Sequence, residues 1–107
     1  NKVVVNNQSS LAAEARYQLA INAYKTGNVD AAEKAALASI ENSGSYEFWI
    51  TRSYILLGDI FLQQKDFFNA KATLKSVVEN CSIPELKLEA TEKLKAVEIA
   101  EKTGLNK

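Results

Sequence analysis

Apolar residues recur at helical spacing along most of the chain, and short polar runs divide this pattern into five segments. These segments begin near Ser10, Asp30, Tyr46, Asp66 and Ser82, and they end at Gly27-Asn28, residues 42–45, Lys65, residues 80–82 and Gly104. Residues 1–9 are polar apart from Val3, Val4 and Val5, and we interpret them as a linker or the end of an upstream element. The pattern predicts an all-α fold of five helices and disfavours strands.

Residues that cap helices support several of these starts. Ser10 offers an N-cap to the first helix, and Asp66 offers one to the fourth. Asp30 and Glu33 have the spacing of a capping box, in which each side chain bonds the backbone N–H of the other residue. The run Ser82-Ile83-Pro84-Glu85 combines an N-cap, a first-turn proline and a capping-box glutamate. It predicts the start of the last helix.

The third and fifth predicted helices differ in how their apolar residues are distributed. The third is apolar on nearly every side, with Phe48, Trp49, Ile50, Tyr54, Ile55, Leu56, Leu57, Ile60, Phe61 and Leu62, so it needs several neighbours. The fifth has one stripe of Ile83, Leu86, Ala90, Leu94, Val97 and Ala100. Its opposite face is mostly Lys and Glu, with Leu88 and Ile99 as exceptions. Charged residues such as Glu89, Glu92, Lys93 and Lys95 are interpreted as a solvated face.

The chain contains an internal repeat with one constant offset, which equals the distance in sequence from Leu19 to Leu57. This offset places Leu19 on Leu57, Ala20 on Gly58, Asn28 on Asp66, Ala32 on Ala70, Ile40 on Val78, and Glu41-Asn42 on Glu79-Asn80. One repeat therefore contains two helices, which predicts successive helical hairpins.

Residues at these positions resemble the signature of the tetratricopeptide repeat (TPR) family in a divergent, bacterial form. The resemblance covers about residues 13–82 and is carried by Leu19-Ala20, Gly27, Ala32, Tyr54, Leu57-Gly58, Phe61, Ala70 and Leu74. It implies an α-solenoid of antiparallel hairpins, with repeat 1 at 10–44, repeat 2 at 45–82 and a capping helix at 83–103 within one domain, 10–107. It also implies that the small-residue pairs 20/32 and 58/70 are in contact.

The chain departs from the family's pattern in five ways. Arg16 occupies a position that is usually aromatic, Lys65 replaces a turn glycine, and Ala36 is small where a bulky residue is common. The usual proline after each unit is missing. The period is also longer than that of the family by about one helical turn, which we attribute to an added turn around positions 46–49.

Composition narrows the classes of partner. Thirteen basic residues balance thirteen acidic ones, and no basic run occurs, so nucleic acid is not expected as a partner. No segment approaches the roughly 20 apolar residues of a membrane span, so membrane insertion is not expected. Cys81 is the only cysteine and is interpreted as a small buried residue. The chain has no methionine, so we expect it to be a fragment or a processed domain of a larger protein.

The groups that catalysis requires are scarce. Histidine, the commonest general base and transition-metal ligand, is absent from the sequence. A single cysteine cannot build a zinc site, and neither a glycine-rich phosphate loop nor a nucleophile elbow occurs. We therefore expect no enzyme activity, no cofactor and no metal.

The family resemblance implies a concave groove lined by the first helix of each hairpin. Its variable positions fall on Glu14, Tyr17, Ile21, Tyr24, Lys25, Arg52, Ile55, Asp59, Leu62 and Gln63. A protein or peptide is the expected partner, because tyrosine and arginine often dominate binding energy. Alternatively, Tyr17, Tyr24 and Ile55 pack between hairpins, since aromatic stripes at helical spacing are usually core. The paired Lys and Asn by which chaperone-binding members clamp a terminal carboxylate are not reproduced here.

The sequence thus predicts a non-catalytic protein-interaction scaffold. The alternative is a structural spacer or self-association domain, whose first helix packs on upstream repeats or on a second copy. The style of the repeats is similar to that of bacterial envelope and periplasmic proteins, with the cytoplasm as the alternative location.

Overall fold

The computed structural model describes residues 10–42 and 46–105, and all of its regular structure is α-helical. The helices are α2 (Ser10–Lys25), α3 (Val29–Asn42), α4 (Glu47–Gln63), α5 (Phe67–Asn80) and α6 (Pro84–Leu105). This confirms the predicted all-α class with five helices in the described part of the chain. The region assigned to a linker, residues 1–9, lies outside the described residues.

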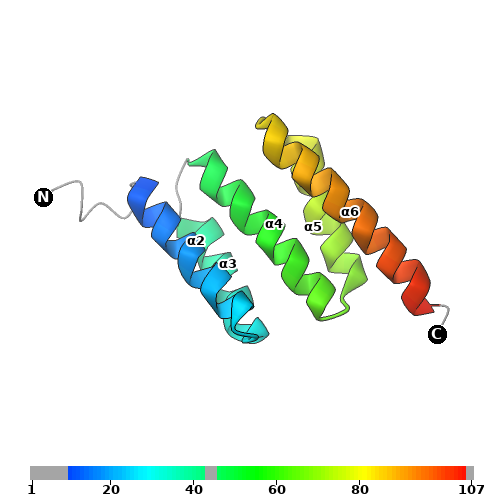
Figure 1. Cartoon of the computed structure of the whole chain (residues 1–107). Coiled ribbons are helices and arrows are strands. Elements are labelled where there is room, and N and C mark those ends of the chain that lie inside the picture. The colour runs from blue at the N-terminus through cyan, green and yellow to red at the C-terminus, as the bar shows by residue number, and fades with distance from the viewer. Residues whose placement is uncertain (1–9, 43–45, 106–107) are drawn as a thin grey trace, which may run out of the picture.

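The helices form two layers in an elongated molecule of 56 × 30 × 16 Å. Helices α2, α4 and α6 lie side by side in one layer, and α3 and α5 lie behind them (Figure 1). Each helix packs against the next one along the chain, and α4 also contacts both α2 and α6. The layer of α2, α4 and α6 therefore presents one continuous surface.

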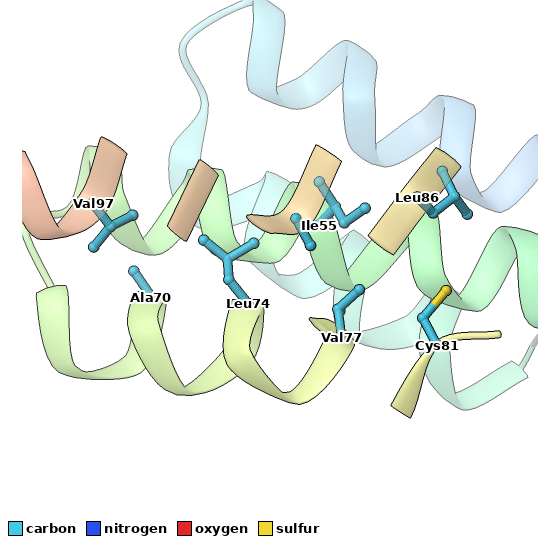
Figure 2. Close-up of a cluster of buried hydrophobic side chains, with 8 residues drawn as sticks. Ile55, Ala70, Leu74, Val77, Cys81, Leu86 and Val97 are labelled. Atoms are coloured by element: carbon cyan, nitrogen blue, oxygen red, sulfur yellow. The ribbon is translucent and has the colours of Figure 1, made fainter. Parts of the chain in front are cut away.

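The core consists of two apolar clusters that meet at α4. One contains Tyr17, Ala20, Ala32, Ala36, Leu56, Leu57 and Ile60, and it joins α2 and α3 to α4. The other contains Ile55, Ala70, Leu74, Val77, Cys81, Leu86, Ala90 and Val97, and it joins α4 to α5 and α6 (Figure 2). Because α4 contributes to both, it needs apolar residues on several sides, as its sequence predicted.

The two hairpin turns have the same backbone form. Gly27 has a φ of 86°, and Lys65, its equivalent in the second repeat, has a φ of 63°. Glycine adopts this left-handed region readily, whereas lysine does so at a cost of about 1–2 kcal/mol. The repeat therefore keeps the geometry of its turn even where it has lost the glycine.

Two predicted caps are wrong. Asn28, rather than Asp30, caps α3, because its Oδ1 accepts a hydrogen bond from the N–H of Ala31 at 3.3 Å. The turn at Gly27 brings Asn28 directly to the start of the helix, and Asp30 then lies in the first turn. The hydroxyl of Ser82 does not cap α6 but donates to the Glu47 carboxylate at 2.7 Å.

Of the other predicted helix ends, the starts at Asp66 and Pro84 are confirmed, the stop at Gly104 is shifted, and the cap at Ser10 stays a prediction. Asp66 caps α5 by accepting from the N–H of Asn69 at 3.2 Å, and Pro84 opens α6. Helix α6 continues through the predicted stop, Gly104, to Leu105, a difference within the usual fraying of helix ends. The residues before Ser10 are outside the described part, so its capping role stays a prediction.

Gly58 of α4 lies close to the side chain of Leu74 of α5. A Cβ atom at Gly58 would lie 2.7 Å from both Cγ and Cδ2 of Leu74. The resemblance implied Ala70 as the partner of this glycine, but Leu74 is the nearest side chain to it.

Candidate functional site

The ten residues predicted to line a groove differ widely in exposure. Lys25 and Gln63 are exposed, whereas Tyr17 and Ile55 are buried. The others have intermediate exposure: Glu14, Ile21, Tyr24, Arg52, Asp59 and Leu62. The predicted positions therefore form partly a surface and partly the core beneath it.

Tyr17, Arg52 and Glu89 form one row across α2, α4 and α6. The Arg52 guanidinium carbon lies 5.6 Å from the centre of the Tyr17 ring, and Arg52 Nη2 donates to the Tyr17 hydroxyl at 3.5 Å. Arg52 Nη1 donates to Glu89 Oε1 at 2.9 Å. The Tyr17 ring is fixed in turn by Trp49, whose ring centre is 5.8 Å away. Arg52 thus links its two neighbouring helices through one planar group.

Asp59 of α4 and Lys93 of α6 form a second row, which Tyr24 of α2 extends through its electrostatic interactions with both charges. Lys93 Nζ donates to both Asp59 carboxylate oxygens, at 2.9 and 3.1 Å. Burial raises the pKa of Asp59 although the Lys93 hydrogen bond and charge oppose that shift. The pKa of Tyr24 is also raised, first by burial and then by the negative charge of Asp59. Tyr24 therefore lies within the field of this ion pair.

The order of charges along α4 is the reverse of the order along α6. Along α4 a cation, Arg52, is followed by an anion, Asp59, whereas along α6 the anion Glu89 precedes the cation Lys93. Their side chains are between 25% and 37% exposed, so each pair can still contact a molecule at the surface. We refer to this set of two rows as the cross-helix surface.

The interpretation of Glu89 and Lys93 as part of a solvated face holds only in part, because their side chains are 37% and 32% exposed but both pair with α4. Glu92 and Lys95, from the same run, are exposed as predicted. The sequence indicates why Glu89 and Lys93 differ from Glu92 and Lys95 in their contacts, since positions 89 and 93 flank the apolar stripe that contains Leu86, Ala90 and Val97.

The remaining predicted residues do not join the two rows. Ile55 is 3% exposed and lies in the cluster beneath α6, with Leu86 (Figure 2). Leu62 packs against the same cluster, and Ile21 packs against the cluster that joins α2 to α4. Glu14 borders a shallow depression on α2 that also includes Leu11 and Leu19.

The described residues offer little for metal or redox chemistry. No group of three or more His, Cys, Asp or Glu side chains in this part of the chain is placed to hold a metal ion. Cys81 is buried, as predicted, and its Sγ accepts a hydrogen bond from the N–H of Ile83 at 3.3 Å. Among the described helices, none is long and apolar enough to cross a membrane.

Comparison with known proteins adds no relative. No protein-family model matches the chain, and neither the curated proteins nor the solved structures give a match. The repeat and the cross-helix surface are therefore the basis for a functional proposal.

Proposed function

We propose that this chain is a non-catalytic protein-interaction scaffold, an α-solenoid of two TPR-like hairpins in which α6 is the capping helix. It holds a peptide or a segment of another protein on the cross-helix surface. The single observation that carries this proposal is that two rows of polar and aromatic side chains cross α2, α4 and α6 on one face.

The solenoid part of the proposal is supported by features that recur at the repeat offset. Gly27 and Lys65 share a left-handed backbone, and Asn28 and Asp66 both cap the helix that follows. Contacts of α4 with both α2 and α6 agree with hairpins stacked in one direction. These features support a shared origin for the two hairpins, and all of them are observed in this chain itself.

The charges on α4 suggest what kind of peptide would bind. Arg52 and Asp59 are two helical turns apart, which corresponds to roughly 10 Å along a helix. An extended peptide covers that distance in about three residues. A segment with an acidic residue and a basic residue at this spacing, in either order, would meet both groups. An aromatic or aliphatic residue between them would contact Tyr24, which is partly exposed, whereas Tyr17 is buried.

A single alanine variant would not separate an effect on peptide binding from an effect on folding. Arg52→Ala would leave the Glu89 carboxylate without this partner and would remove one of the two ion pairs between α4 and α6. Exchange of the two charges, Arg52→Glu with Glu89→Arg, keeps an ion pair between the helices while it reverses the charge offered on each. The matched control exchanges Glu92→Lys with Lys95→Glu on the exposed side of α6.

The experiment selects short random displayed peptides on the full chain and measures their affinity for each variant. We expect the Arg52/Glu89 exchange to weaken binding by about tenfold or more, as for interface anchors, with its helical content by circular dichroism close to that of the original chain. The Glu92/Lys95 exchange should leave affinity nearly unchanged. Peptides that bind all three chains equally, or no enrichment at all, would contradict the proposal.

A further inference from the structure

One face of α2 is left uncovered by the other described residues, 26–42 and 46–105. Leu11 is 74% exposed and Leu19 is 67% exposed, and they border a shallow depression with Ala15, Gln18 and Asn22. These five residues follow one another at intervals of four, three, one and three, so they lie on one side of the helix. We call them the open strip.

The internal repeat shows where the equivalent strip of α4 lies. The repeat offset places the open strip on Trp49, Ser53, Leu56, Leu57 and Ile60. Four of these residues belong to or pack against the apolar cluster that includes Ala32 and Ala36 of α3. The fifth, Ser53, shares a hydrogen bond of 2.8 Å with Ser39 of α3 and is fully buried. The equivalent surface on α4 is thus covered by the hairpin that precedes it.

We propose that the open strip binds a helical hairpin of the kind that α2 and α3 form. The site continues an interface that already exists within the chain, and the occupant is defined by that interface. Its covering helix should present small residues, because Ser39 of α3 lies against Ser53 in the strip of α4, and Ala32 and Ala36 of α3 belong to the same cluster as Leu56, Leu57 and Ile60.

Differences between the two strips define the occupant further. Ala15 replaces Ser53 and has no hydroxyl, so the residue that faces it should be alanine or glycine rather than a serine like Ser39. Gln18 and Asn22 replace Leu56 and Ile60, and their amides need hydrogen-bonding partners at the edge of the contact. Less apolar area is buried here than at α4, so this interface is the weaker of the two.

Neither α3 nor α6 of a second folded copy fits this description. Its own α3 already packs against its α4, where Ser39 is bonded to Ser53. The exposed side of its α6 carries Glu92 and Lys95 between Leu88 and Ile99, which would place charges against Leu11 and Leu19. The proposal commits to a further hairpin, because that occupant would repeat the contact that α3 makes with α4.

The test extends the full chain by one hairpin. Residues 9–46, with Ser39→Ala in the added copy, are placed directly before residue 9, and thermal unfolding is measured with and without Leu19→Gln in the original α2. We expect the substitution to leave the midpoint of the 107-residue chain within about one degree, because Leu19 is exposed there. In the extended chain it should lower the midpoint by roughly 3–10 °C, since the leucine is buried.

A matched leucine and a second measurement complete the design. Leu88→Gln, at an exposed leucine of α6, should leave both chains unchanged. If Leu19→Gln is equally silent in both chains, the open strip does not accept a hairpin and the proposal is wrong. Sedimentation of the 107-residue chain should show a monomer. A dimer that Leu19→Glu dissociates and Leu88→Glu does not would overturn the proposal in favour of a second copy.

Discussion

Gly58 and Leu74 occupy the positions that Ala20 and Ala36 occupy one repeat earlier. All of these residues are buried, and Ala20 and Ala36 belong to one cluster, so the equivalent positions hold two alanines in one hairpin and a glycine with a large residue in the other. The sequence predicted that residues 20 and 58 must be small. It did not predict Leu74 as the neighbour of Gly58, because a family pattern specifies size at a position and leaves open which neighbour fills the space.

We expect Gly58→Ala to destabilise the protein by about 1–3 kcal/mol through overpacking, because its Cβ would overlap the Leu74 side chain. The larger Gly58→Leu should cost more. The free energy of unfolding is measured by urea denaturation. Leu74→Ala opens the space, so the double variant should be less destabilised than the sum of the two single variants. Strict additivity would place the glycine and the leucine too far apart to interact.

At the scale of elements, helix existence was predictable and helix starts were less so. Apolar periodicity located all five helices, since burial of one face decides whether a helix forms. The caps of α3 and α6 were misplaced because several residues near each start, such as Asn28 and Asp30, could have served. Only the three-dimensional path distinguishes them. Ser82, for example, is directed by the fold to Glu47, a residue 35 positions away.

The contact between Glu47 and Ser82 leads to a pH-dependent prediction. The Ser82 backbone N–H and hydroxyl both donate to the Glu47 carboxylate, and the backbone bond is the largest cause that lowers the pKa of this carboxyl. A lowered pKa in the folded state means that the contact stabilises the protein above the pKa of the unfolded chain and is lost as pH falls through the folded value.

Glu47→Gln should therefore lower the urea midpoint at neutral pH and have little effect at a pH below the folded pKa of Glu47. The measurement is a set of urea titrations of both chains from pH 7 towards pH 3. Glu41→Gln, at an exposed glutamate on α3, is the control and should show no such dependence. A difference between Glu47→Gln and the original chain that stays constant with pH would show that the charge of Glu47 does not matter.

At the scale of the whole molecule, α4 connects everything else. It contributes Leu56, Leu57 and Ile60 to one cluster and Ile55 to the other. The contacts of α4 with both α2 and α6 are compatible with the hairpins that the repeat offset predicted. The ion pairs from α4 to α6 were not predicted, because long charged side chains at a stripe's edge can point either to solvent or across to a neighbour.

Ile60→Ala should reveal whether the two clusters unfold together. Ile60 is fully buried, so its truncation should cost about 2–5 kcal/mol. Because α4 joins both clusters, native-state hydrogen exchange should accelerate by a similar factor in α3 and in α5. Phe68→Ala, at a side chain that is 78% exposed, should have little effect on either. Exchange that accelerates in α3 alone would mean that the two halves unfold independently.

The hydrogen bond between Ser39 and Ser53 has a consequence for how uniquely α3 and α4 dock. Apolar contacts have no direction, and alanine-rich helices can slide past each other by a turn at little cost in buried area. Two fully buried hydroxyl groups, 2.8 Å apart, permit no such freedom. A shift by one turn would separate them in a dry environment and leave each without the other as a partner. This small polar contact therefore selects one register among several of similar hydrophobic energy, and so fixes the spacing at which α2 and α4 present their side chains to a partner.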